Sequence, residues 1–321
     1  MDIKIIGVGT CGYHAVTHMY RKGIHDVSFM LCSADRQALM HSEISVKLVL
    51  GHSGSGLDAG NNPERWRIAA LESENEIRRL LNDGTKMVII IAGMGGSTGT
   101  GASPVIAAIA REMNILTVGI VTIPFLFEGK RKIIKALNGV EEMNRNVDTL
   151  LIINYEHLHK TFHDLSLQDI FGKADEALAI AVKNITEIIT LPGIIHLPFA
   201  DIHSIMKDGG VTFMNNGYGQ GEGGLEQAIE NALDSPYLNS DEVFRSKKIL
   251  LHLSFSKDAE IKVEELNIIH DFMARFRQHT EAIWGASIDD TLGEKVKVLV
   301  LATGFGLDDI PEMKDNMRLH G

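Results

Sequence analysis

The chain has 321 residues, which is enough for two domains of ordinary size. Hydrophobic residues make up 45% and charged residues 23%, as in a soluble globular protein. The formal net charge of -11 argues against nucleic acid as a partner and gives little attraction to anionic lipid, because both are negatively charged. No apolar run is long enough to span a membrane, and the N-terminus leads directly into a predicted strand. We therefore expect a cytoplasmic protein without direct membrane insertion, whose two cysteines, Cys11 and Cys32, are reduced.

Predicted strands and helices alternate in the first half of the chain. Buried strands are expected at residues 3–8, 27–32, 46–50, 87–92, 116–124 and 150–153. Helices are expected from about Tyr13, from Pro63 to about Leu81, from Pro104 to Met113 and from about Gly129 to Asn144. This alternation predicts a Rossmann-like parallel sheet of the α/β class, with helices on both faces.

A long apolar helix is predicted to separate this region from a second α+β domain. Apolar side chains recur every three or four positions over residues 167–190, and Pro192-Gly193 ends the pattern. A loop is expected at 194–202, and a glycine-rich run at 209–224 precedes a helix at 225–233. Further strands are expected at 249–255, 282–288 and 296–303, with a helix at 263–278. The predicted parts are 1–166, the central helix 167–192, the second domain 193–306 and a short tail 307–321.

A glycine-rich loop follows the strand at 87–92. Residues 93–101 read Gly-Met-Gly-Gly-Ser-Thr-Gly-Thr-Gly, with five glycines and three hydroxyl residues. Glycines let backbone N–H groups approach an anion, hydroxyls add donors, and the next helix directs its positive end at the charge. The Gly-Lys-Ser/Thr ending of a Walker loop is absent. The loop predicts a phosphate site held by backbone and hydroxyl groups; the alternative is a turn without a ligand.

A second glycine motif follows the first strand. Residues 7–12 read Gly-Val-Gly-Thr-Cys-Gly, the spacing of a dinucleotide fingerprint, and Asp35 lies where such a unit has its ribose-binding acid. This favours, as one alternative, an oxidoreductase that uses NAD(P). The loop at 95–101 argues against it, since hydride transfer has no use for two phosphate loops of this kind.

The run Gly95–Gly101 also resembles the signature of the tubulin and FtsZ family of GTP-dependent filament proteins. Similarity to FtsZ extends from Ile3 to about Thr303, with several motifs in the same order. The resemblance implies the tubulin/FtsZ fold, GTP or GDP binding, GTPase activity and a role in bacterial cell division and septation. The nucleotide-binding residues that it implies are Gly9, Thr10, Cys11, Gly12, Tyr13, His14, Ala59, Gly60, Asn61, Gly95, Gly96, Ser97, Thr98, Gly99, Thr100, Gly101, Glu128, Lys132, Phe171, Asp175 and Glu176.

Several of these positions depart from the family pattern. Thr10 and Cys11 replace glycines, His14 replaces an asparagine, and Lys132 stands where an arginine is usual. The resemblance implies that Phe171 stacks on guanine, although core packing is an equal alternative for this ring.

Two acids are implied to read the base edge. Asp175 and Glu176 occupy the positions of the family's asparagine and aspartate. Carboxylates suit guanine because its N1–H and its 2-amino group are both donors, whereas N1 of adenine is an acceptor. One acid of the right reach would suffice, and the alternative is that both are solvated helix residues.

The loop after the central helix departs most from the family pattern. The family pattern is Asn-x-Asp-Phe-Ala-Asp, in a loop that enters the next subunit's nucleotide pocket; this chain reads His196-Leu197-Pro198-Phe199-Ala200-Asp201. The resemblance implies that Asp201 polarises the attacking water and that His196 orients it, although a structural role is an alternative for His196. Loss of one acid predicts weak hydrolysis. A second hypothesis is therefore a poorly hydrolysing paralogue that regulates filaments of another FtsZ.

The resemblance also implies partners and cofactors. We expect a head-to-tail homopolymer located at the division site, with 193–306 as the activation and association domain. Magnesium would bridge the β- and γ-phosphates, and potassium is an expected second cation. Another FtsZ and a membrane adaptor are the other expected partners; Asp309-Ile310-Pro311 is similar to three residues of the family's adaptor-binding peptide.

Overall fold

The computed structural model describes residues 2–51, 62–161, 164–191, 193–234, 240–259, 261–311 and 313. The chain divides into two compact units, Met1–Thr186 with Leu307–Gly321, and Glu187–Gly306. The boundary between them falls within the long helix α8 (Leu167–Thr190). None of the helices in the described residues combines the length and apolar character needed to span a bilayer.

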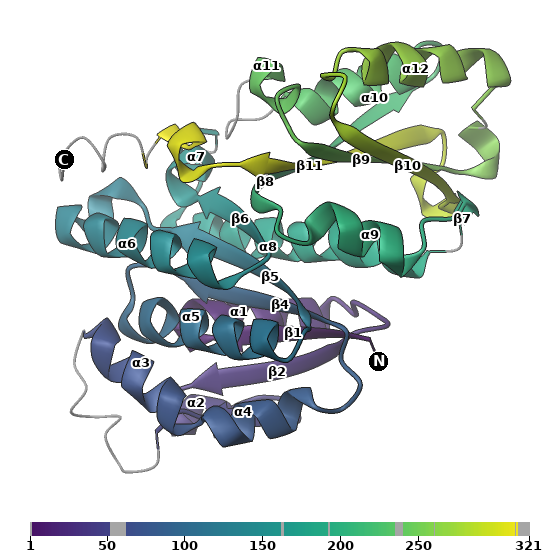
Figure 1. Ribbon diagram of the computed structural model, residues 1–321. Coiled ribbons are helices and arrows are strands. Elements are labelled where there is room, and N and C mark those ends of the chain that lie inside the picture. The colour runs from purple at the N-terminus through teal and green to yellow at the C-terminus, as the bar shows by residue number, and fades with distance from the viewer. Residues whose placement is uncertain are drawn as a thin grey trace. The chain divides into compact units, whose positions relative to one another are not determined.

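The first unit is built on a parallel sheet (Figure 1). Its strands lie in the order β3 (Val46–Val49), β2 (Ser28–Ser33), β1 (Ile3–Val8), β4 (Met87–Gly93), β5 (Leu116–Ile123) and β6 (Thr149–Asn154), all parallel. Every residue of β1, β5 and β6 is buried, as expected for strands with both faces covered. Strands β2 and β3 extend the sheet on one side of β1, whereas β4, β5 and β6 extend it on the other, so the strand order switches sides between β1 and β4. One glycine loop follows β1 and the other follows β4. Ligands bind at such a point in open α/β sheets.

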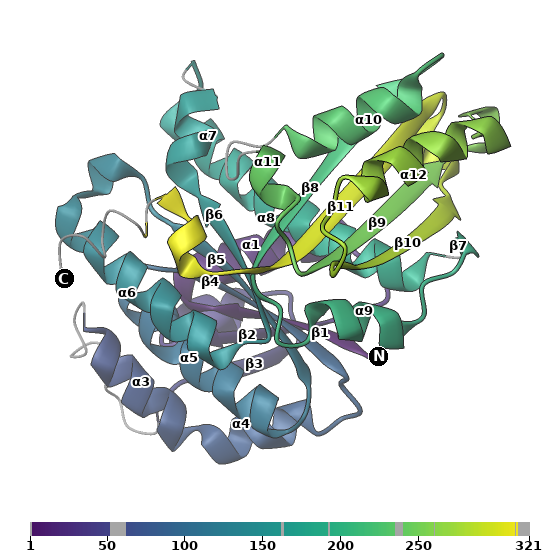
Figure 2. The same ribbon diagram turned by 45° about the horizontal axis from the view of Figure 1, so that its top comes forward.

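Helices connect these strands. They are α1 (Gly9–Arg21), α2 (Arg36–His41), α3 (Pro63–Glu72), α4 (Glu74–Leu81), α5 (Ser97–Glu112), α6 (Lys130–Asn146) and α7 (Tyr155–Thr161). The row formed by α3, α5 and α6 is visible in Figures 1 and 2. Helices α1 and α5 begin earlier than predicted, because residues of each glycine loop already form the first helical turn.

The single helix predicted from Pro63 to Leu81 is wrong: the structure has two helices that meet at Ser73. The Ser73 hydroxyl donates to the carbonyl oxygen of Ala69 at 2.9 Å. A serine that bonds to the backbone in this way competes with helical hydrogen bonding.

The second unit contains a mixed sheet. Its strands lie in the order β8 (Gly210–Gln220), β11 (Lys295–Phe305), β9 (Lys248–Phe255), β10 (Glu281–Ile288) and β7 (Gly193–Ile195). Strands β9 and β10 are parallel, and β11 is antiparallel to both of its neighbours. Its helices are α9 (Phe199–Met206), α10 (Gly224–Leu233), α11 (Ser240–Val243) and α12 (Leu266–Ala274); α10 and α12 lie on the opposite face of the strands from α9 (Figure 1). The α+β class is confirmed.

The loop predicted at 194–202 is wrong, and a strand that was not predicted lies in the glycine-rich run. Residues 194–202 include part of β7 and the start of α9, and the glycine-rich run contains β8. The glycines of β8 permit close helix packing: a Cβ at Gly217 would lie 2.0 Å from the Ala228 carbonyl oxygen, and one at Gly219 would lie 1.9 Å from that of Gly224. Here glycine marks a buried strand and helix contact rather than a turn.

Candidate nucleotide-binding site

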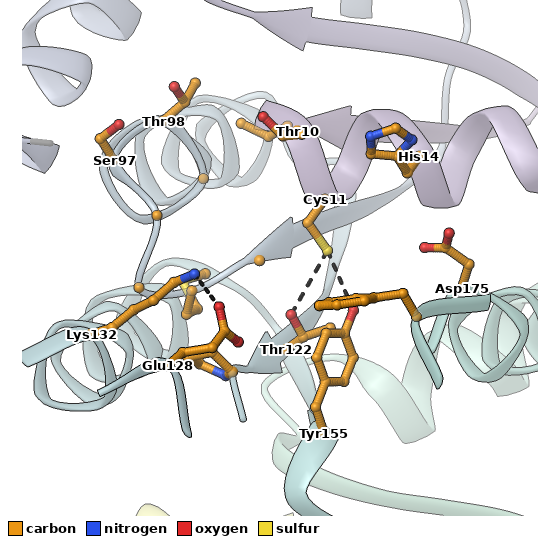
Figure 3. A pocket seen from close by; sticks show the side chains of 18 residues that line it. Thr10, Cys11, His14, Ser97, Thr98, Thr122, Glu128, Lys132, Tyr155 and Asp175 are labelled. Carbon is orange, nitrogen blue, oxygen red and sulfur yellow. Dashed lines mark hydrogen bonds and ion pairs between the residues drawn. The ribbon is translucent and has the colours of Figure 1, made fainter. Parts of the chain in front are cut away.

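A cavity of about 770 Å³ opens at the carboxyl ends of the strands of the first unit (Figure 3). This volume is within the usual range for small-molecule sites. The residues that line it are Val8, Thr10, Cys11, His14, Gly93, Met94, Gly95, Gly96, Ser97, Thr98, Gly99, Thr122, Pro124, Glu128, Lys132, Tyr155, Phe171 and Asp175.

The cavity brings together twelve of the residues predicted from the sequence: Thr10, Cys11, His14, Gly95, Gly96, Ser97, Thr98, Gly99, Glu128, Lys132, Phe171 and Asp175. Six others lie outside its lining: Gly9, Gly12, Tyr13, Thr100, Gly101 and Glu176. Ala59, Gly60 and Asn61 fall outside the described residues. His196 and Asp201 belong to the second unit.

The glycine loop between β4 and α5 forms one wall. Gly95 has a φ of +93°, which favours glycine, and its N–H donates to the Thr100 hydroxyl at 2.9 Å. Gly96 is the N-cap of α5 and has no side chain to occupy the first N–H groups of the helix. Ser97 and Thr98 line the cavity beside these groups. This wall can bind an anion through backbone and hydroxyl donors.

Two of the predicted glycines have a packing role. A Cβ at Gly12 would lie 2.4 Å from the Ile91 carbonyl oxygen, so only glycine lets α1 approach β4 this closely. A Cβ at Gly101 would lie 2.0 Å from the carbonyl oxygen of Pro63, where α5 packs on α3. Both residues position the loops without lining the cavity.

Cys11 makes a small polar cluster in the cavity wall. Its Sγ lies 3.5 Å from Tyr155 Oη and 3.8 Å from Thr122 Oγ1, as Figure 3 shows. Burial raises the pKa of the Cys11 thiol, and hydrogen bonds with Tyr155 and Thr122 oppose the shift. Burial also raises the pKa of Tyr155 well above its ordinary value. Thiol and phenol are therefore neutral hydrogen-bonding groups near pH 7, and neither Cys11 nor Cys32 forms a disulfide.

Sequence reasoning missed Tyr155. The signal was its position: it directly follows β6, at the edge of the sheet where both glycine loops lie.

An ion pair forms another part of the wall. Lys132 Nζ donates to a Glu128 carboxylate oxygen, and the two side chains face each other in Figure 3. The other carboxylate oxygen of Glu128 accepts a hydrogen bond of 3.0 Å from the Phe125 N–H. Glu128 thus stabilises the turn at Leu126–Glu128. It also holds the ammonium group of Lys132, which faces the cavity.

The first turns of α8 provide an aromatic and acidic wall. The Phe171 ring meets the Phe125 ring edge-on, at 5.4 Å between centroids and 87° between planes, while 43% of Phe171 stays exposed. Asp175 follows one helical turn later, on the same face. Glu176 lies outside the lining and pairs with Lys173 at 2.8 Å. A planar ring beside an acceptor is suited to a base whose edge carries donors.

Burial dominates the electrostatics of Asp175. It raises the pKa of the Asp175 carboxyl, while His14 and His18 act in the opposite direction. The Lys173 hydrogen bond instead lowers the pKa of Glu176. Of the two acids, Asp175 is the one that faces the cavity (Figure 3).

The predicted catalytic residues lie on either side of the start of α9: His196 precedes the helix and Asp201 is in its first turn. Pro198 is the N-cap of this helix, and the Asp201 N–H donates to its carbonyl oxygen at 3.0 Å. The Asp201 carboxylate is in the first turn, where the helix dipole favours a negative charge. The His196 side chain is exposed.

Asp35 has a local structural role. Its carboxylate caps α2 by accepting a hydrogen bond of 2.9 Å from the Ala38 N–H. Asp35, which the oxidoreductase alternative would have bind a ribose, is thus the N-cap of α2 in this structure. In the described residues, no group of three or more His, Cys, Asp or Glu side chains is arranged to hold a metal ion.

Glycine loops at the switch point of a Rossmann sheet, beside an aromatic and acidic wall, define a nucleotide-binding α/β protein. Residues 2–163 match the model of the Tubulin/FtsZ family, GTPase domain, and residues 210–306 match that of the FtsZ family, C-terminal domain. The chain belongs to the Tubulin/FtsZ family, on its FtsZ branch.

Individual relatives agree with this assignment. The chain is 50% identical over 312 residues to the cell division protein FtsZ of Porphyromonas gingivalis, which covers 97% of this chain and 68% of the relative. It is 39% identical over 304 residues to cell division protein FtsZ 1 of Thermococcus kodakarensis, covering 94% and 80%. A solved FtsZ dimer of M. jannaschii is similar with a TM-score of 0.82 and 33% identity, over 94% of this chain and 88% of that one. These findings confirm the predicted family and do not favour the oxidoreductase alternative.

Proposed function

We propose that the chain binds GTP and GDP in the cavity of the first unit. The phosphates would lie on the glycine loops, with Ser97 and Thr98 as hydroxyl donors and Lys132 as a cation. The base would stack on Phe171 and donate its N1–H and 2-amino hydrogens to Asp175. The observation that carries this proposal is the position of Asp175 in the cavity, one turn from an exposed aromatic ring.

The experiment is a comparison of nucleotide affinities. We expect GTP and GDP to bind far more tightly than ATP, and Asp175→Asn to reduce this selectivity, because an amide presents a donor as well as an acceptor to the base. Glu176→Gln is the matched control, since Glu176 pairs with Lys173 outside the lining. Equal affinity for ATP and GTP in the unmodified protein would overturn the proposal.

We propose hydrolysis at a head-to-tail contact between subunits. Asp201 of one subunit would polarise water at the nucleotide of the next, with His196 orienting that water. Magnesium would neutralise the β- and γ-phosphates, and potassium is the second cation that we assign. The similarity to a solved FtsZ dimer supports self-association. Such a heterologous contact repeats into a filament instead of closing on itself as a symmetric pair does.

This proposal divides the chain into working parts and places it in the cell. Residues 1–166 form the GTP-binding domain, and 167–192 form the central helix, whose first turns supply Phe171 and Asp175. Residues 193–306 form the activation and association domain, and 307–321 form a short tail. The names of the relatives support a role in cell division. We infer action at the division site in the cytoplasm, with another FtsZ and a membrane adaptor as further partners.

A second candidate is a regulator of filaments that hydrolyses GTP weakly. Pro198 and His196 favour it, because they replace a carboxylate and an amide of the family pattern. The double variant His196→Asn with Pro198→Asp should then increase GTP turnover by about tenfold or more, since loss of an acid or base commonly costs 10²–10⁴-fold. An unchanged rate would count against this candidate. Ala200→Ser, two residues after Pro198, is the control.

A further inference from the structure

A basic and aromatic surface of the second unit lies beyond the ends of α11 and α12. We call it the basic patch and define it by six residues, Phe244, Arg245, Lys247, Arg275, Phe276 and Arg277. Two hydrogen bonds hold its two segments together. The Thr280 hydroxyl donates to the Ser246 carbonyl oxygen at 3.0 Å, and the Glu281 N–H donates to the Lys247 carbonyl oxygen at 3.0 Å.

Aromatic rings fix the position of this patch. The rings of Phe244 and Phe276 lie 4.9 Å apart between centroids, and they lie 6.0 Å and 5.3 Å from the ring of the buried Phe272. The guanidinium carbon of Arg275 lies 4.0 Å from the centroid of the Phe244 ring, in a cation–π contact. A guanidinium held in this way loses less side-chain freedom when it binds a carboxylate, so the patch is preorganised for an anionic partner.

The positive charges of the basic patch are not neutralised within the chain. Four cationic side chains are exposed and form no ion pair with another described residue: Arg245, Lys247, Arg275 and Arg277. The nearby Glu281 carboxylate instead accepts a hydrogen bond of 3.1 Å from the Ser204 hydroxyl. This concentration of positive charge contrasts with the formal net charge of the whole chain, which is -11.

An acidic stripe follows α10, which covers the same face of the strands as α12 (Figure 1). Its carboxylates recur at every fourth position, at Glu222, Glu226, Glu230 and Asp234. All four side chains are exposed, and none is in an ion pair within the part of the chain that the structure describes. Like charges four positions apart on a helix repel each other, and the C-cap residue Asp234 also meets the negative end of the helix dipole. Cations placed opposite this stripe would relieve the repulsion.

We propose that the basic patch of one subunit binds the acidic stripe of a second copy of this chain, in a lateral contact between neighbouring filaments. This inference rests on the proposed head-to-tail assembly. A second copy is the occupant because the chain itself carries both complementary surfaces. Since the patch and the stripe lie on one face, two copies that face each other can pair each patch with the other's stripe. Helix α9, which carries Asp201, covers the opposite face of the strands (Figure 1).

This contact is weak between two subunits and effective between filaments. Exposed ion pairs contribute little each in water, and salt screens them. Guanidinium and carboxylate groups form the stronger pairs, because two N–H groups can bind both oxygens. A filament presents the same surface on every subunit, so the first contact brings the following ones into proximity. Lateral association should therefore require head-to-tail assembly and low salt.

The test exchanges the charges of the two surfaces. A patch variant combines Arg275→Glu with Arg277→Glu, a stripe variant combines Glu226→Arg with Glu230→Arg, and an exchange variant carries all four changes. Electron microscopy after addition of GTP and magnesium distinguishes single filaments from bundles, and light scattering measures the bundles. At about 50 mM salt we expect the unmodified protein to form bundles and the patch and stripe variants to scatter at least about threefold less. The exchange variant should bundle again.

Arg36→Glu with Lys262→Glu is the matched control, because both cations are exposed outside the basic patch and the net charge changes equally. Bundles of the patch variant or the stripe variant that match those of the unmodified protein would overturn the inference. Single filaments of the exchange variant would show that the stripe is not the partner of the patch. Single filaments of the unmodified protein, with patch-dependent sedimentation on phosphatidylserine vesicles, would overturn it in favour of an anionic membrane surface.

Two further measurements separate this inference from misfolding and from the proposed function. Arg275→Gln with Arg277→Gln removes both charges without adding new ones, and it should also give single filaments; bundles of this variant would contradict the inference. GTP turnover per subunit should stay within about twofold in every variant, since these exposed residues lie outside the cavity lining. Absence of filaments of the unmodified protein would instead overturn the proposed head-to-tail assembly.

Discussion

The Gly95 N–H donates to the Thr100 hydroxyl at 2.9 Å, so the glycine loop is held by the first turn of the helix that it precedes. Thr100 is buried and lies outside the cavity lining. The family resemblance predicts that Thr100 binds nucleotide, whereas this geometry favours an indirect role, in which its hydroxyl fixes the backbone that would meet the phosphates.

Thr100→Val should therefore weaken both folding and nucleotide binding. It leaves a buried N–H without a partner, which costs about 1–3 kcal/mol of unfolding free energy. Loss of the loop conformation should reduce GTP affinity by about tenfold, equivalent to about 1.4 kcal/mol. Denaturant unfolding and GTP titration measure the two effects. Thr100→Ser keeps the hydroxyl and should retain most of both; equal losses in the two variants would contradict this role.

Gly101→Ala should destabilise the fold by several kcal/mol, because its Cβ would lie 2.0 Å from the Pro63 carbonyl oxygen and would force α5 away from α3. Gly96→Ala is the comparison. A Cβ at Gly96 would lie 3.9 Å from its nearest neighbour, the Gly93 carbonyl oxygen, so the fold should tolerate this substitution. The new methyl group would become part of the cavity lining. Thermal unfolding should separate the two variants. A stable Gly101→Ala protein would show that the contact of α5 with α3 can relax.

His252 should make the second unit sensitive to acid. Burial and the nearby Lys297 lower the pKa of His252 to about 4, against the opposing charge of Glu187. The folded protein thus holds His252 neutral while the unfolded chain gains a proton below about pH 6.5. The contribution to stability is complete above about pH 6.5 and is lost as the pH falls toward 4, by at most about 3 kcal/mol.

The free energy of unfolding, measured by denaturant from pH 7 to pH 4, checks this expectation. His252→Gln should show a smaller decrease over this range than the unmodified protein. His279→Gln changes an exposed histidine and should show the full decrease. If His252→Gln lost as much stability on acidification as His279→Gln, this role of His252 would be excluded.

Strong periodic patterns made most of the first unit predictable. Unbroken β-branched strands and two glycine loops identify a parallel sheet and its ligand-binding edge, as the order of β1 and β4 confirms. The second unit was harder, because the glycines of β8 resemble a loop until α10 is seen to pack on Gly217 and Gly219.

The candidate site was predictable in outline, but the division of tasks within it was not. The sequence offers Asp175 and Glu176 as equivalent acids, and their difference arises from the face of α8 and from the Lys173 pair. Tyr155 comes from a strand end far along the chain, so no local motif includes it. In the sequence, Thr100 looks equivalent to the neighbouring hydroxyl residues Ser97 and Thr98. The hydrogen bond that its hydroxyl accepts from the Gly95 N–H distinguishes it from them.

The measurement that most directly tests the central proposal is the rate of phosphate release from GTP against protein concentration, with magnesium and potassium present and ATP as control. We expect turnover per subunit to rise steeply above a threshold concentration, because Asp201 would complete the site of a neighbouring subunit, and we expect Asp201→Asn to abolish the rise. Tight GTP binding with a rate per subunit that is independent of concentration would contradict hydrolysis between subunits.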